Sequence, residues 1–264
     1  MGNRKSKIGA RSKTAAISLE DAPQPAPAET DVQKAVSGNK EVAHFISSMK
    51  AMTPHTQGDA GQKRGRLIFA MDATMSRQPT WDMALAMQGD MFEAVQEVGG
   101  LDVQLVYFRG LKECRSSKWV SNPAALAKLM ATVHCAGGLT QIGKIISHAR
   151  QATETLTINA MVFVGDAVEE DIDSLCHKAG DLALLGVPVF IFQEGHNRQA
   201  EIAFREIARL TKGAFCRFDQ GAAAQLRALL SAVAVFAAGG RQALEDFSRS
   251  NSGRSAQLLI EQIK

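Results

Sequence analysis

The stretch RLIFAMDATMS, residues 66–76, leads from an apolar segment directly into three oxygen-bearing side chains. The five apolar residues 67–71 have the length and composition of a buried strand. Asp72, Thr74 and Ser76 follow at alternate positions, and alternate side chains of an extended chain point to the same side. The stretch therefore predicts a buried strand whose end presents one carboxylate and two hydroxyls together.

Strand-like and helix-like segments alternate from residue 66 onward. Apolar strand-like segments occupy 67–72, 102–109, 160–166, 187–193 and 214–219, and helical periods occupy 80–98, 122–133, 140–155, 170–184, 198–211 and 221–237. This alternation predicts an α/β fold with a doubly wound, mostly parallel sheet flanked by helices. Residues 112–120 lack a helical period and predict a short antiparallel edge strand, and Asn122-Pro123 predicts the start of a helix.

Three segments flank this domain, which we place at residues 66–237. Residues 1–33 carry five basic residues and no acid in their first 13 positions, then an Ala/Pro-rich run, which is typical of a disordered tail. Residues 34–65 predict an amphipathic helix and a linker. Residues 238–264 predict a C-terminal helical tail with a polar break at NSGRS, 251–255.

Composition argues against a nucleic acid partner. The chain has 264 residues, 45% apolar and 22% charged, as in soluble globular proteins that bury a core. Its 30 basic and 27 acidic residues leave a net charge of only +3. Aromatic residues make up 6%, and no basic run alternates with them, so bases would find little to stack on.

The compartment that the sequence predicts is the cytoplasm. Four cysteines lie far apart with no CxxC pair, which disfavours a zinc site or a redox dithiol and favours buried thiols. No apolar stretch approaches the about 20 residues of a membrane span, and the N-terminus lacks the apolar part of a secretory signal. The opening MGNRKS matches the N-myristoylation pattern through Gly2 and Ser6, a short match that we interpret as chance.

Two further strand ends supply oxygen ligands. Thr140 follows the pair Gly137-Gly138 at the start of a helix, and Asp166 ends the strand-like segment AMVFVGD. Ligands of doubly wound sheets bind at the carboxyl ends of the strands, so these residues are expected beside the end of the first strand. Carboxylate and hydroxyl oxygens suit Mg²⁺, which prefers octahedral oxygen coordination.

The ordered set Asp72-Ala-Thr74-Met-Ser76, then Thr140, then Asp166, resembles the metal-ion-dependent adhesion site of the von Willebrand factor type A (vWA) domain. The resemblance covers about residues 66–237 and implies that the three hydroxyls bind Mg²⁺ or Mn²⁺ directly, while the two acids support the metal, often through water. It also implies a partner protein whose Asp or Glu fills the open metal position. Thr74 stands where the family usually has serine, and GDA replaces its more frequent TDG.

An enzyme is not what this pattern predicts, because no nucleophile–base pair is evident, but other interpretations stay open. Gly138–Lys144 matches the phosphate-binding G-x-x-x-x-G-K, although Ile145 stands where Ser or Thr is required. A haloacid dehalogenase-like phosphatase would use Asp72 as nucleophile, although it wants a second Asp where Thr74 stands. A third alternative is a metal-independent scaffold.

Each candidate side chain also has a purely structural interpretation. Asp72 and Thr74 can cap a helix starting near Thr80, and Thr140 can cap the helix that it precedes. We expect Trp81 to be a core contact rather than a surface anchor. The three motifs together, in order across an α/β pattern, favour the binding module.

Overall fold

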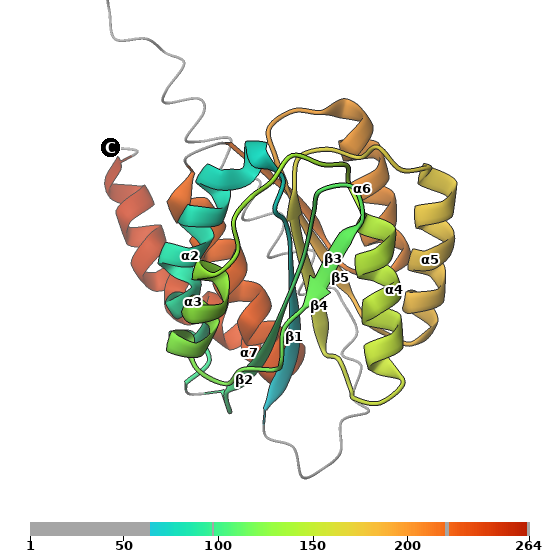
Figure 1. Ribbon diagram of the computed structural model, residues 1–264. Helices are drawn as coiled ribbons and strands as arrows, with labels where there is room; N and C mark the ends of the chain where they lie inside the picture. Colours follow the sequence, from blue (N-terminus) through green and yellow to red (C-terminus); the bar gives the residue numbers. More distant parts are fainter. Residues whose placement is uncertain (1–63, 97, 220–221, 263–264) are drawn as a thin grey trace, which may run out of the picture.

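The computed structural model describes residues 64–96, 98–219 and 222–262 (Figure 1). The expected tail at 1–33, and the expected helix and linker at 34–65 apart from their last two residues, lie outside the described residues.

Six strands form one sheet in the order β3-β2-β1-β4-β5-β6. All neighbouring strands are parallel except β2 and β3, which pair antiparallel at one edge. The predicted doubly wound sheet and its antiparallel edge strand are therefore confirmed. The strand bounds are β1 Gly65–Asp72, β2 Leu101–Arg109, β3 Glu113–Ser116, β4 Ala160–Gly165, β5 Val189–Glu194 and β6 Phe215–Phe218.

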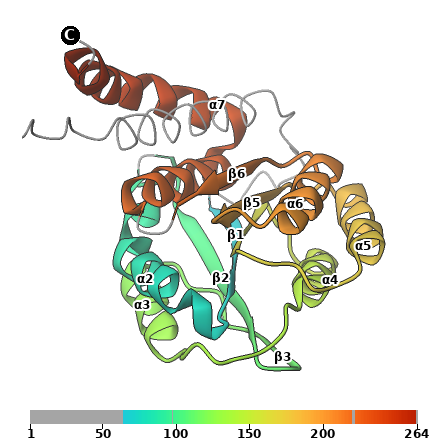
Figure 2. The same cartoon turned by 90° about the horizontal axis from the view of Figure 1, so that it is seen from above.

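Helices cover both faces of the sheet, as Figure 2 shows. One face packs against α2 Gln78–Glu93, α3 Pro123–Ala131 and α7 Ala223–Gln262, and the other packs against α4 Ile142–Thr153, α5 Ile172–Leu184 and α6 Arg198–Leu210. A short 3-10 helix, η1 Met75–Arg77, connects β1 to α2.

The first strand β1 contributes to both cores because its side chains alternate. Leu67, Phe69 and Met71 lie in the core under α2 and α7, whereas Ile68 and Ala70 lie in the core under α4 and α6. Each large apolar side chain buried in this way contributes roughly 1.5–3 kcal/mol. The burial holds β1 in the middle of the sheet and so fixes where Asp72 lies.

Three helices begin at side chains that accept a backbone hydrogen bond. Asn122 accepts from the amide of Ala125 at 2.9 Å, with Pro123 next to it, so the predicted start of α3 is confirmed. Asp171 caps α5 and Asn197 caps α6 in the same way. No side chain caps α2, so Asp72 and Thr74 do not have the capping role that their spacing also allowed.

The C-terminal helix α7 corrects the predicted position of the break. The helix is interrupted at Gly240, with φ 67° and ψ −159°, and residues 251–255 are helical. Glycine adopts positive φ without a Cβ clash, so Gly240 can turn the chain. Asn and Ser are only weak helix formers and are tolerated within a helix.

Residues Ala223–Phe247 of α7 are long and apolar enough to cross a membrane, which corrects the expectation that no stretch approaches that length. More than half of the apolar window, 56%, is buried within the fold. Leu229 and Val233 are core residues under the sheet. Since the core helix of a folded domain passes the same test of length and composition, the packing of α7 explains its apolar character.

The loop between α3 and α4 lies against two neighbouring turns. The amide of Ala136 donates to the carbonyl of Ala73 at 3.0 Å, and that of Leu139 donates to the carbonyl of Gly110 at 3.2 Å. At Gly138 an added Cβ would lie 2.1 Å from the Gly110 oxygen, so this approach requires glycine. The loop that carries Thr140 is thereby fixed to the ends of β1 and β2.

Gly138→Ala should therefore destabilise the fold by about 1–3 kcal/mol, the usual cost of forcing a methyl group into a packed position. Gly137→Ala is the matched control, because an added Cβ there has no atom within 4 Å. Urea unfolding of both variants measures the difference. Equal stabilities would show that the close backbone approach is not maintained.

Candidate functional site

The five predicted residues lie around the switch point of the sheet. The strand order reverses at β1, which has β2 on one side and β4 on the other. Asp72 is the last residue of β1, and Asp166 directly follows β4. The parallel arrangement of β1 and β4 brings both carboxylates to the same edge.

The turn after β1 arranges the two hydroxyls side by side. Asp72 accepts a hydrogen bond from the amide of Thr74 at 2.7 Å, which folds the chain into η1. The Oγ1 of Thr74 then lies 3.4 Å from the Oγ of Ser76. Ser76 is exposed and Thr74 is half-buried, so both hydroxyls are accessible at the surface above the buried acid.

The Asp72 carboxyl group is almost completely buried, with 2% of the residue exposed. Burial raises the pKa of Asp72 from 3.8 to about 6, against the lowering effect of its hydrogen bonds with Thr74. The nearby charge of Asp166 raises this pKa further, and the charge of Arg77 lowers it. Among the described residues, no lysine or arginine forms an ion pair with Asp72. A buried acid of this kind is suited to a bound cation.

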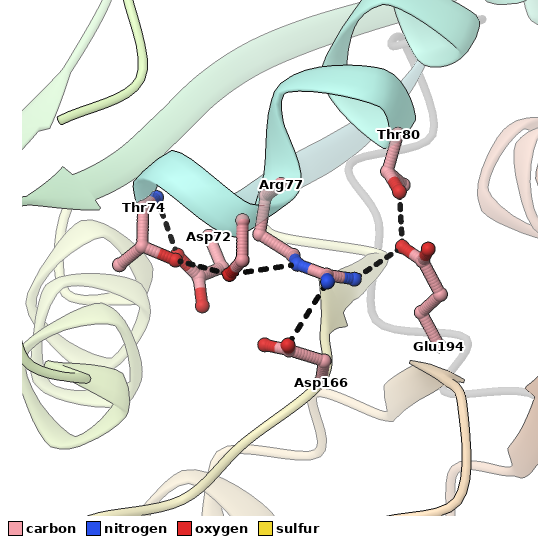
Figure 3. Close-up of polar contacts among 7 residues, drawn as sticks. Asp72, Thr74, Arg77, Thr80, Asp166 and Glu194 are labelled. Atoms are coloured by element: carbon pink, nitrogen blue, oxygen red, sulfur yellow. Dashed lines mark hydrogen bonds and ion pairs between the residues drawn. The ribbon is translucent and has the colours of Figure 1, made fainter. Parts of the chain in front are cut away.

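Arg77 lies within the candidate site, although the sequence did not predict it there. Figure 3 shows its guanidinium between two carboxylates: Nη2 pairs with Asp166 at 3.0 Å, and Nη1 pairs with Glu194. Its Nε lies 3.4 Å from the Ser76 hydroxyl, and the hydroxyl of Thr80 also donates to Glu194. Arg77 therefore connects the β1–α2 turn to the ends of β4 and β5.

The sequence gives only weak signals for Arg77 and Glu194. Arg77 directly follows Ser76, but a positive arginine beside a cation site would repel the cation, so its sequence position did not suggest a role. Glu194 ends β5, so the rule that sites form at carboxyl strand ends pointed to it. Glu194 is 4% exposed, and burying this acid requires the cation that Arg77 supplies.

Thr140 is held by the loop that follows Asp166. Its hydroxyl accepts from the amide of Glu169 at 2.9 Å, and its own amide donates to the Glu169 carboxylate at 2.8 Å. The residue is 6% exposed. Thr140 thus lies on the neighbouring loop with its orientation fixed. The β1–α2 turn and Arg77 link the other four predicted residues directly: Asp72, Thr74, Ser76 and Asp166.

The N-terminus of α4, where the nucleotide alternative places a phosphate, already holds a carboxylate. Glu170 accepts from the amides of Ile142 at 2.5 Å and Gly143 at 2.9 Å. The Lys144 amine donates to the carbonyl of Lys112 and to the side chain of Gln141. The segment before this helix is a loop rather than a strand, so the geometry disfavours a phosphate-binding loop.

The phosphatase alternative also lacks its geometry. Asp72 is 2% exposed, and Thr74 stands where the second aspartate of such a phosphatase is expected. The magnesium site of this alternative would combine Asp166 with Glu170 or Asp171, but Glu170 accepts from the first amides of α4 and Asp171 caps α5.

The donor set matches the chemistry of a hard divalent cation. No cluster of three or more His, Cys, Asp and Glu side chains suited to a metal occurs in the part of the chain that the structure describes. The candidate set instead combines hydroxyls with acids. Three carboxylates, of Asp72, Asp166 and Glu194, face one guanidinium, so two negative charges remain, which one divalent cation would balance.

Comparison with solved structures identifies the fold. The structure superposes on the SpRpn10 VWA domain with a TM-score of 0.50 and 12% sequence identity, covering 67% of this chain and 97% of that one. The fold is that of a vWA domain. No protein-family profile and no curated protein sequence matches the chain.

Parts of two larger proteins have a similar fold. The pilus adhesin SpaC from Lactobacillus rhamnosus GG superposes with a TM-score of 0.53 and 11% identity, over 72% of this chain and 31% of its own. Proximal thread matrix protein 1 from the mussel byssus superposes with a TM-score of 0.50 and 15% sequence identity. The superposition covers 66% of this chain and 46% of that protein. The chain spans less than half of these two proteins, and at such identities the likeness concerns the fold alone.

Asp72→Asn should stabilise the metal-free protein at about pH 8 while removing its pH dependence. Because the folded pKa is raised, stability from Asp72 is fully present below the ordinary value of 3.8 and is lost as the pH rises through about 6. A shift of this size corresponds to a gain of about 3 kcal/mol well above pH 6. Denaturant unfolding in chelator across this range measures it, with Asp82→Asn on the exposed side of α2 as control; equal slopes for both variants would contradict the burial effect.

Arg77→Met should destabilise the fold by about 3–5 kcal/mol, since it leaves the buried Glu194 carboxylate without a cation. The double variant Arg77→Met/Glu194→Gln should recover much of this loss, because only Asp166, which is more exposed than Glu194, is then left without its partner. Arg115→Met is the control, since the exposed Arg115–Glu113 pair should contribute less than about 1 kcal/mol. Thermal unfolding compares the three, and additive effects in the double variant would contradict the coupling.

Proposed function

We propose that the chain is a divalent-cation-dependent protein-binding module whose metal accepts a carboxylate from a partner protein. The observation that carries this proposal is the Asp72 carboxylate, buried without a paired cation beneath the adjacent hydroxyls of Thr74 and Ser76. A divalent cation would compensate that acid and use the hydroxyls as ligands.

Each side chain has a defined part in the proposed site. The hydroxyls of Thr74, Ser76 and Thr140 would bind Mg²⁺ or Mn²⁺ directly, and Asp72 and Asp166 would support it as acidic groups. When bound, the cation supplies an open coordination position for an anionic oxygen. Hydroxyls donate little charge, so the metal remains electrophilic toward a partner's Asp or Glu.

Arg77 keeps the charge of the site low. Its guanidinium neutralises Glu194 and contacts one oxygen of Asp166, so only two of the surrounding negative charges face the cation. An additional unpaired acid would repel an incoming carboxylate. The buried Arg77 side chain therefore favours binding of a partner's carboxylate at the cation.

The vWA-like fold supports a binding role over an enzymatic one. A neighbour with this fold is named a pilus adhesin and another a thread matrix protein, names that refer to attachment and structure. The site contains hydroxyls and acids held by backbone hydrogen bonds. Among the described residues, His148 contacts Gln104 and His196 contacts Asp219, and no histidine bonds to a hydroxyl of the site. We propose a cytoplasmic adaptor that binds protein rather than nucleic acid.

Calorimetric titration with Mn²⁺ and Mg²⁺ tests the proposal. Binding is expected for the wild type and for Ser116→Ala, a control on the exposed end of β3, and should weaken at least about tenfold in Ser76→Ala, which loses one ligand of the few that the protein supplies. A parallel ATP titration with Lys144→Ala examines the nucleotide alternative. Metal affinity equal in wild type and Ser76→Ala, or ATP binding that requires Lys144, would contradict the proposed function.

A further inference from the structure

Apolar side chains are exposed around the proposed metal site. Large hydrophobic residues are exposed at six described positions, and half of these lie at this edge of the sheet: Met75 is 63% exposed, Leu111 is 72% and Leu139 is 50%. The others, Leu184, Leu185 and Ile202, lie at the end of α5 and on the outer side of α6. Exposed apolar residues gathered at one functional edge indicate an interaction surface.

The three apolar side chains at the site belong to loops that the backbone joins together. Met75 lies in η1 between the proposed ligands Thr74 and Ser76, and Leu139 directly precedes Thr140. The loop of Leu139 is bonded to the turn of Leu111 through Gly110, and to the end of β1 through Ala73. Figure 1 places these loops at the same end of the sheet.

A cation at the proposed site would attract an acidic partner. Among the nearby acids, Glu113 pairs with Arg109 and Arg115, whereas Glu169 and Glu170 accept hydrogen bonds from backbone amides and keep their negative charge. The side chain of Lys112 is exposed next to Leu111. A cation at the site would add further positive charge between the apolar side chains.

We propose that Met75, Leu111 and Leu139, which we call the apolar rim, form a docking surface for a protein segment in which an acidic residue is flanked by apolar side chains. The inference rests on the proposed function, because the acidic residue is the one that reaches the metal. The rim adds the chemical character of the partner: its carboxylate binds the cation and its neighbouring apolar side chains pack on the rim. Each such contact should change affinity about tenfold.

Selection from a displayed library of random peptides with one fixed central Asp, in Mg²⁺ buffer, tests the rim. Wild-type protein should enrich apolar residues beside the Asp about tenfold, and the enrichment should disappear for Met75→Ser/Leu139→Ser. Leu184→Ser/Ile202→Ser is the matched control, because it removes equally exposed apolar side chains away from the site and should retain the preference. Replacing the fixed Asp by Asn, or adding chelator, should abolish selection.

The possible outcomes separate the rim from the metal site. Mg²⁺-dependent selection of Asp without apolar preference would overturn the rim and leave the proposed function standing. Selection that ignores both Mg²⁺ and the Asp would overturn the proposed function and the rim with it. Self-association in sedimentation experiments that the rim variant removes would assign the rim to a second copy of the chain and so contradict the proposal.

Discussion

The buried carboxylate of Asp72 is the constraint on which the arrangement of the site depends. It stands at the end of the central strand, 2% exposed, and its bond to the Thr74 amide directs the chain into η1. The alternating side chains of β1 pack into both cores, so the position of Asp72 at the end of the strand is fixed. The fold therefore maintains a carboxylate where burial opposes its charge, which is typical of a functional group rather than a stabilising one.

Stability and function compete at this edge of the sheet. Arg77 compensates Glu194 and Asp166 from within the protein, but Asp72 lacks such a partner among the described residues. The neighbouring loops are fixed by backbone contacts, with Glu170 on α4 and Gly138 against Gly110. These contacts hold the neighbouring loops in place, and Asp72 is the buried acid there without a paired cation in the described part of the chain.

The hydrophobic pattern was sufficient to predict the sheet, because buried parallel strands are continuous apolar runs. The strands β1, β4 and β5 all have such runs. The order of the motifs identified Asp72, Thr74 and Ser76 and brought Asp166 to the same edge. The contact between Arg77 and Glu194 joins residues 117 positions apart, and periodicity carries no information about such a pair. The break at Gly240 was also missed, since a glycine's backbone angle depends on its packing rather than on its neighbours in sequence.

Anomalous scattering from crystals of the protein grown with Mn²⁺ would locate the proposed cation. We expect a manganese peak bonded to the hydroxyls of Ser76 and Thr140, beside Asp72, with Arg77 still paired with Glu194. A fully ordered site without manganese, or a peak bound elsewhere on the molecule, would contradict this expectation and leave a vWA-like fold that works without metal.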